Sequence, residues 1–270
     1  MLNLKLSFIS LMTGCCIFVS AQTSRSELLA HMDLASGNYC NYPNPTGHIT
    51  APPAGYEPFY VTHYGRHGAR YMTDDDHYKY VIGKMDTAQI RGLLTETGKE
   101  ILCRLKVAAE NAFHRDGDLT QLGGQQHRAI AHRLCVNYPS LMKQPICVKA
   151  NSSTVRRCML SMANFCLELK TMNPLLTIMM DASEHDMYYL LPNDSISIPE
   201  SETDGPLYEK LDKFCHKMLN GHRLMGVLFN DAKAATEYID DYRFADGLWN
   251  IACDMSCLPE LNLTFDRSRS

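Results

Sequence analysis

Residues 59–70 read FYVTHYGRHGAR, and this stretch decides the predicted fold class. Residues 59–63 are rich in aromatic and β-branched side chains, which predicts a buried strand that stops at Gly65. The cluster at 66–70 follows directly and so lies at the carboxyl end of that strand. Open α/β sheets bind their ligands at this edge. We therefore expect an α/β protein with a ligand site just after residue 65.

Further helices and strands alternate downstream of this stretch. Apolar periodicity predicts helices over 97–113, over 120–138 with Thr120 as the N-cap, and over 155–170 with residues 151–154 as the cap. Runs of β formers predict short strands at 146–150 and 175–180. This order favours a three-layer α/β sandwich with a mostly parallel sheet.

The composition and pattern of the sequence change at residue 181. Residues 194–205 are polar and contain proline, and helical patterns follow at 207–219 and 232–242. We expect an α/β core at 22–180, a helical cap subdomain at 181–257 laid over the sheet edge, and an irregular tail at 258–270.

The first 21 residues have the pattern of an export signal. Lys5 is followed by a mostly apolar stretch at 6–19, and Val19-Ser20-Ala21 supplies small residues for cleavage before Gln22. A periplasmic or secreted protein is expected, with a lipoprotein anchored at Cys15 as the alternative. The apolar stretch is short for a bilayer span, and no later stretch is long and apolar enough, so no membrane span is expected.

Net charge limits the possible binding partners, and the cysteine content limits the possible disulfides. A net charge of −4 argues against a nucleic-acid partner, so an anionic substrate would have to be held by a local basic cluster. Nine of the eleven cysteines follow the signal, and an odd number leaves at least one unpaired. Cys253 and Cys257 are candidates for a local pair, and there is no CxxC zinc pattern.

The cluster at 66–70 has the chemistry of a phosphate site. A transferring phosphoryl group spreads negative charge over three oxygens, and the planar guanidinium groups of Arg66 and Arg70 suit such an anion. Gly68 allows a close backbone approach. The imidazole of His67 can then act as the nucleophile, provided that its other nitrogen is bonded to an acceptor such as a backbone carbonyl.

A second basic cluster supports this interpretation. Arg157 follows the strand predicted at 146–150 and opens a helix, whose N-terminus also favours anions. Its guanidinium can reach the same phosphate, whereas Arg156 is expected to point to solvent.

Several motifs resemble a known family. Residues 64–71 resemble the RHGxR signature of the histidine phosphatase superfamily, in its acid phosphatase and phytase branch. Two further segments of this branch, LTxxGxxQ and Ser-Thr…Arg-xxx-Ser, are similar to Leu119-Thr120 with Gly123 and Gln126, and to Ser153-Thr154 with Arg157 and Ser161. Residues 181–186 resemble the multiple inositol polyphosphate phosphatase group. Together the matches cover about residues 56–190.

The resemblance implies an activity. It implies His67 as the catalytic nucleophile and Arg66, Arg70 and Arg157 as substrate-binding residues, in a phosphomonoesterase that works without metal or cofactor. It also implies an α/β core with a helical cap, and phosphorylated inositols, phytate included, as the small-molecule substrates.

One element of the family pattern is missing. The family carries a late His-Asp or His-Ala-Glu, whose acid protonates the leaving alcohol. Here the only such pair is His185-Asp186, which fits the inter-domain segment better than a late catalytic strand. Since family members are usually longer, we expect the chain to be truncated at its C-terminal end.

Three alternatives stay open. His63, His67 and His77 with residues 74–76 would form a metal site, although the arginines beside His67 repel a cation. A truncated relative would bind phosphate without turning it over. A phosphoglycerate mutase relative shares the RHG motif but not the export signal.

Overall fold

The computed structural model describes residues 25–45, 49–191, 206–219 and 221–261. The predicted signal with Cys15, the segment 194–205 and most of the tail lie outside these ranges. The chain divides into two compact units, Met1–Cys40 and Asn41–Ser270. In the first, the described residues form α2 (Arg25–Ala30) and the 3₁₀ helix η1 (Met32–Tyr39). Within the described ranges, no helix combines the length and hydropathy that a membrane crossing requires.

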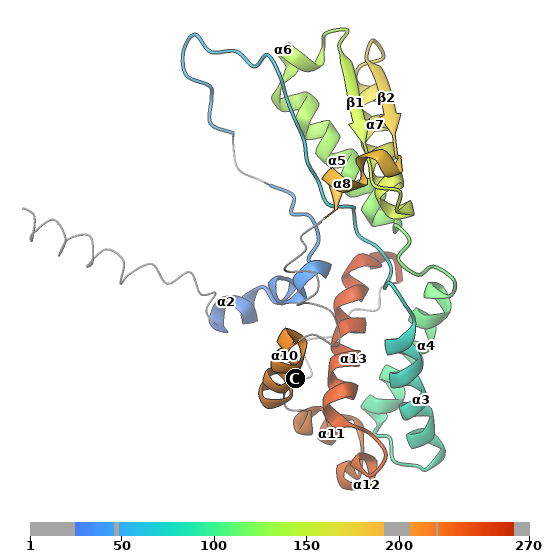
Figure 1. The fold of residues 1–270 in the computed structure, drawn as a ribbon. Coiled ribbons are helices and arrows are strands. Elements are labelled where there is room, and N and C mark those ends of the chain that lie inside the picture. The colour runs from blue at the N-terminus through green and yellow to red at the C-terminus, as the bar shows by residue number, and fades with distance from the viewer. Residues whose placement is uncertain (1–24, 46–48, 192–205, 220, 262–270) are drawn as a thin grey trace, which may run out of the picture. The chain divides into compact units, whose positions relative to one another are not determined.

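The second unit is mostly helical (Figure 1). In chain order its elements are α3 (Asp76–Ile90), α4 (Glu96–Ala112), α5 (Gln121–Asn137), α6 (Pro139–Met142), β1 (Cys147–Asn151), α7 (Arg156–Met172), β2 (Thr177–Asp181), α8 (Glu184–Leu190), α10 (Pro206–Met218), α11 (His222–Leu228), α12 (Ala232–Thr236), α13 (Asp241–Asp254), η2 (Met255–Cys257) and η3 (Pro259–Leu261).

The described residues form one sheet, and it has two strands. β1 and β2 run parallel, in a register that pairs Cys147 with Thr177 and Asn151 with Asp181. Helices α5 and α7 pack along each other, and α7 contacts both strands. Their shared core is small: Ala131, Cys135, Met142, Leu169 and Leu176. The predicted strands at 146–150 and 175–180 are thus confirmed as a parallel pair, but a three-layer sandwich is not confirmed.

The strand predicted at 59–63 is wrong. Phe59 is 93% exposed and Tyr60 is 74% exposed, while Val61 is partly buried against the core beside the sheet. β-propensity measures how well a side chain fits a half-buried pleated surface, and here no described strand pairs with this segment. Residues 59–63 therefore run without regular secondary structure into residues 66–70, which we call the His67 loop.

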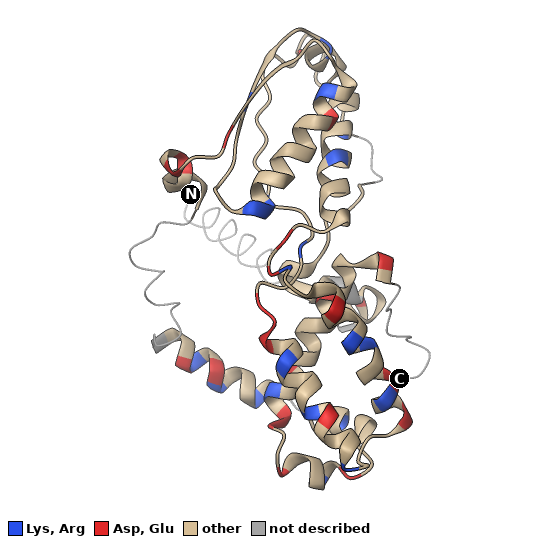
Figure 2. Ribbon diagram, turned by 90° about the vertical axis from the view of Figure 1, so that its right-hand side faces the viewer, with Lys and Arg blue, Asp and Glu red and all other residues tan. Residues whose placement is uncertain are grey.

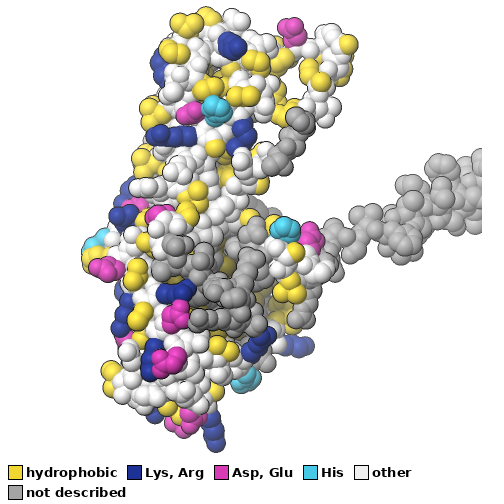
Figure 3. All heavy atoms as spheres, turned by 180° about the vertical axis from the view of Figure 1, so that it is seen from behind, with side chains coloured by type: hydrophobic (Ala, Val, Ile, Leu, Met, Phe, Trp, Pro, Cys, Tyr) yellow, Lys and Arg dark blue, Asp and Glu magenta, His cyan; other side chains and the backbone are white. Residues whose placement is uncertain are grey.

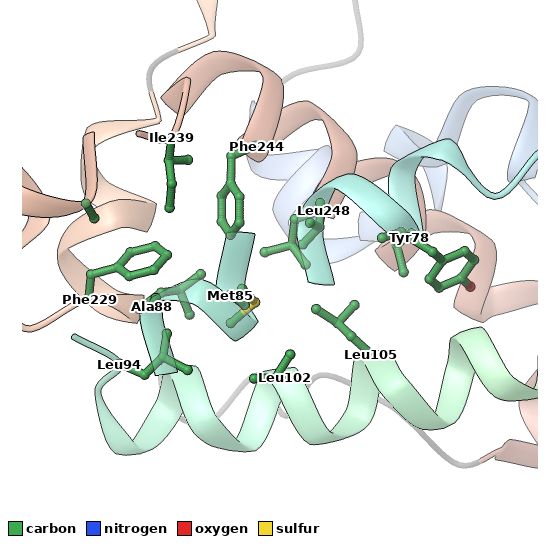
Figure 4. Close-up of a cluster of buried hydrophobic side chains, with 14 of the residues drawn as sticks. Tyr78, Met85, Ala88, Leu94, Leu102, Leu105, Phe229, Ile239, Phe244 and Leu248 are labelled. Atoms are coloured by element: carbon green, nitrogen blue, oxygen red, sulfur yellow. The ribbon is translucent and has the colours of Figure 1, made fainter. Parts of the chain in front are cut away.

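A larger core joins helices that are far apart in the sequence. Apolar residues of α3 and α4 pack against α11 and α13, and Figure 4 shows Phe244 and Leu248 directed toward Met85, Leu102 and Leu105. The α4 residues Leu102, Leu105 and Ala108 recur at helical spacing and form its buried face. α3 and α4 precede residue 181 and α11–α13 follow it, so helices from both sides of the predicted domain boundary share this core. The division into 22–180 and 181–257 stays a prediction.

Most predicted helices are confirmed, with local corrections. The patterns at 97–113, 120–138, 155–170 and 207–219 correspond to α4, α5, α7 and α10. α7 is capped by Val155 without a side-chain bond, because the Thr154 hydroxyl donates instead to a Glu184 carboxylate oxygen at 3.2 Å. The pattern at 232–242 divides into α12 and α13, because the Asp240 carboxylate accepts from Arg243 N at 2.9 Å and starts a new helix.

The cysteines carry a further correction. Cys253 and Cys257 form no disulfide with each other. Both side chains are buried and pack as small apolar groups. Burial raises the pKa of the Cys257 thiol.

Candidate active site

The His67 loop is fixed by hydrogen bonds to α5 and α7. Gly68 N donates to Ser161 Oγ at 3.0 Å, and Ala69 N donates to Gln126 Oε1 at 2.8 Å. The carbonyl oxygen of Ala69 accepts from Thr120 N at 2.9 Å and from its hydroxyl at 3.1 Å. Since these residues come from all three family-like motifs, segments that are far apart in sequence form one structural unit.

Two glycines set how closely the loop approaches α5. A Cβ on Gly68 would lie 2.3 Å from Gly123 O, and a Cβ on Gly123 would lie 2.2 Å from Ala69 O. Neither contact is sterically allowed. The close approach expected at Gly68 is therefore an approach to helix α5. The Thr120 hydroxyl completes the contact, because it accepts from Gly123 N at 3.1 Å as the N-cap of α5.

His67 is half-buried and has the geometry of a nucleophile. Its Nδ1 lies 2.8 Å from Gly68 O. Because a carbonyl oxygen can only accept, Nδ1 carries the proton and Nε2 keeps its lone pair. Burial lowers the pKa of His67, and the charges of Arg157, Arg70 and Arg66 lower it further, against the bond to Gly68. The ring is therefore neutral at pH 7, and the three predicted arginines are near enough to act on it.

The arginines are held in different ways. Arg70 Nη1 donates to Tyr71 O at 2.8 Å, and Arg157 Nη1 donates to Gly117 O at 3.4 Å. Arg157 Nε is buried and has no hydrogen-bond acceptor among the described residues. A buried donor of this kind is costly unless a ligand or water accepts from it. Arg156 points outward as expected; its side chain is 70% exposed and lies 3.2 Å from the Asp118 carboxylate.

Two further histidines lie near His67: His127, which was not predicted as a site residue, and His63, which was named only in the metal-site alternative. His127 is buried, and its Nε2 lies 3.2 Å from Arg66 O. Burial is the main cause that lowers the pKa of His127 to about 4, with contributions from the charges of His63 and His67. The ring of His63 stacks on Phe165 with centroids 4.9 Å apart, and burial lowers its pKa as well. The sequence did contain a signal for His127, which follows Gln126 on the buried face of α5.

A buried carboxylate was also missed. Asp254, at the end of α13, is 0% exposed, and neither of its oxygens has a hydrogen bond within the described residues. Burial raises the pKa of Asp254 to about 7, although the charge of Arg70 limits the rise. Residues 251–253 are apolar and predict a buried face, but nothing in the sequence places Asp254 near Arg70.

Two other sets of candidate residues are the metal site that includes His63 and His67, and the pair His185-Asp186. No three His, Cys, Asp or Glu side chains of the described part come close enough together to hold a metal ion. The side chain of His185 is 86% exposed, with its Nδ1 3.0 Å from Asp186. Asp186 accepts from Asn151 Nδ2 at 2.6 Å and so links α8 to the end of β1. Neither residue of this pair is among the charges that shift the pKa of His67.

Among the described residues, Figure 2 shows basic and acidic positions interspersed along the helices. Figure 3 shows hydrophobic side chains at many separate places on one face of the molecule. Exposed apolar residues include Phe59, Tyr60 and Tyr64, together with Met179 and Met180 on β2.

The comparison with solved structures bears on the fold. No family model and no curated protein matches the sequence. Among solved structures, the multiple inositol polyphosphate phosphatase of Bifidobacterium longum in complex with inositol hexasulfate matches with a TM-score of 0.53 and 16% identity, over 83% of this chain. Its complex with phosphate matches with a TM-score of 0.56 and 16% identity, over 81% of this chain. The fold is histidine phosphatase-like. The chain spans 62% and 60% of the lengths of these two structures.

Proposed function

We propose that this protein is a phosphomonoesterase in which His67 attacks phosphorus and forms a phosphohistidine intermediate. The observation that carries the proposal is the environment of His67: a neutral ring with its lone pair on Nε2, under the influence of three arginine charges. A phosphoryl group needs such a nucleophile together with several positive charges.

The reaction follows from this geometry in two steps. In the first, His67 Nε2 bonds to phosphorus as the bond to the ester oxygen breaks, and the departing alkoxide takes a proton from water. Arg66, Arg70 and Arg157 compensate the charge on the phosphoryl oxygens. In the second, water attacks phosphorus, the P–N bond breaks, and inorganic phosphate leaves. In both steps the Gly68 carbonyl oxygen accepts a hydrogen bond from Nδ1–H. This bond stabilises the positive charge that the ring acquires.

Phosphorylated inositols, phytate included, are the proposed substrates. The sequence motifs resemble the inositol polyphosphate phosphatase group, and a solved structure with the same fold was obtained with inositol hexasulfate. A substrate with several phosphates on one ring also suits a local cluster of arginines on a protein of net charge −4.

A second function has a specific observation in its favour. The described residues contain no His-Ala-Glu, and the side chains of His185 and Asp186 are engaged with each other and with Asn151. Without a proton donor, hydrolysis would be slower by about a hundredfold or more. The second candidate is therefore a phosphate-binding relative that does not turn its ligand over.

We also propose that the chain is exported. The support is the pattern of residues 1–21, with the periplasm or the outside of the cell as the destination. N-terminal sequencing of the protein recovered after export would start at Gln22. Incorporation of a labelled fatty acid at Cys15 would instead identify a lipoprotein.

Phosphate binding and turnover are separated by one set of measurements. Calorimetric titration with inorganic phosphate tests binding, and phosphate release from phytate tests turnover. Phosphohistidine is trapped by denaturing the protein in alkali, because P–N bonds hydrolyse in acid. The variants are His67→Ala and, as a matched control on α5, His132→Ala, which changes an exposed histidine.

Each outcome has one meaning. Phosphoenzyme and release that disappear in His67→Ala but persist in His132→Ala support the phosphatase. Phosphate binding with no phosphoenzyme supports the binding protein. If the unmodified chain binds no phosphate, both proposals fail.

A further inference from the structure

The backbone just before His67 is held by two side chains that the proposed mechanism does not use. The Tyr42 hydroxyl donates to the carbonyl oxygen of Arg66. The same oxygen lies 3.2 Å from Nε2 of His127, which must carry its proton there because a carbonyl only accepts. The rings of Tyr42 and His127 meet edge to face with centroids 5.8 Å apart, so the two side chains form one unit.

Tyr42 also contacts the side chain of Arg66. The guanidinium carbon of Arg66 lies over the Tyr42 ring, 5.6 Å from its centroid, at the distance of a cation–π contact. One tyrosine therefore restrains both the carbonyl oxygen and the guanidinium group of the same arginine.

The position of Tyr42 is itself fixed. Its neighbour Asn41 accepts from Gln126 Nε2 at 3.0 Å and donates to Ser256 O at 2.9 Å. Gln126 in turn accepts from Ala69 N in the His67 loop. Tyr42 is thus attached to the elements that hold the loop.

We propose that Tyr42 and His127 are positioning residues that orient Arg66 for the phosphate. The proposal rests on the function proposed above, in which Arg66 is a phosphate ligand. An arginine that is already oriented loses less conformational freedom when the anion binds, and this strengthens binding without any contact between tyrosine and phosphate. His127 stays neutral above about pH 5, because its pKa is about 4, and its donor N–H is therefore constant over the physiological range.

Graded substitutions measure the two contacts, with inorganic phosphate as the probe in calorimetry. Tyr42→Phe removes the hydroxyl but keeps the ring, and phosphate affinity should fall by about twofold to tenfold. Tyr42→Leu removes both contacts, and affinity should fall by about fivefold to fiftyfold. His127→Leu removes the second donor, and His127→Gln, which restores an N–H, should recover part of the loss. Tyr56→Leu is the matched control, because Tyr56 is 72% exposed.

A double-mutant cycle tests whether Tyr42 acts through Arg66. In an Arg66→Ala background, Tyr42→Leu should lose most of its effect on phosphate affinity, by more than the roughly twofold margin within which independent changes are additive. If Tyr42→Leu keeps its full effect in that background, or has none in the unmodified protein, the proposal is overturned.

A second readout needs no phosphate. The ¹⁵N relaxation of Arg66 Nε should report a rigid side chain in the unmodified protein and a mobile one in Tyr42→Leu. If Tyr42→Leu does not fold, the milder Tyr42→Phe decides by the same two measurements. A protein that binds no phosphate but shows Arg66 held by Tyr42 refutes the proposed function alone, whereas phosphate binding with an equally mobile Arg66 in both proteins refutes the positioning role alone.

Discussion

The buried carboxylate of Asp254 makes the stability of this protein depend on pH in a way that one substitution can isolate. Asp254 is 0% exposed, and burial raises its pKa from 3.8 to about 7. One pKa unit corresponds to about 1.4 kcal/mol, so the rise corresponds to about 4 kcal/mol of unfolding free energy. The pKa is raised in the folded state, so this stabilisation is complete below pH 3.8 and is lost as the pH rises through 7.

Asp254→Asn removes the ionisation and keeps the size of the side chain. We expect the variant to gain stability relative to the unmodified protein as the pH rises, by about 4 kcal/mol in total between pH 4 and pH 8. Chemical denaturation of both proteins at a series of pH values measures the difference in their unfolding free energies. The ionisable groups that both proteins share contribute equally and cancel in this difference. Asp116→Asn is the control, because Asp116 is exposed and its substitution should change the stability little. A difference that stays flat for Asp254→Asn as well would refute a raised pKa at this position.

Three further predictions follow from other contacts. Gly123→Ala should cost about 1–3 kcal/mol of unfolding free energy and weaken phosphate binding in calorimetry, because the new Cβ meets the His67 loop. The control is Gly83→Ala, which should not destabilise the protein, because its new Cβ enters open space. Phe244→Ala should cost about 3–5 kcal/mol in chemical denaturation, since Phe244 is fully buried in the helical core. NMR titration should give His67 a pKa below 6.5 that rises in Arg157→Ala, because that charge opposes protonation; an unchanged pKa would place Arg157 away from the ring.

The local structure of this chain could be predicted where short-range chemistry decides it. Thr120 was predicted as a cap and does cap α5. The helix and strand patterns between residues 97 and 180 correspond to helices and strands of the structure. Helix α3 was not predicted, although Tyr78, Val81, Met85 and Ala88 recur at helical spacing and form its buried face. The strand predicted at 59–63 does not form, because β-propensity describes the residues themselves, whereas a strand also requires a paired neighbour.

The same distinction holds for the candidate site. The residue types at 66–70 and at 157 predicted an anion site from their chemistry, and the predicted backbone acceptor for His67 is confirmed as Gly68 O. Tyr42 and Asp254 were missed because each meets its arginine only through the fold. Neither position carries a local pattern that indicates its neighbour.

The helical core has a consequence for how the chain folds. Its contacts are distant in sequence: Lys84 Nζ donates to Tyr238 O across 154 residues, and α3 and α4 pack against α11 and α13. During synthesis the apolar faces of α3 and α4 must remain uncovered until the ribosome has made α13. Such non-local contacts slow folding and expose nascent chains to aggregation, so this half of the molecule should depend on chaperones more than the α5–α7 pair does.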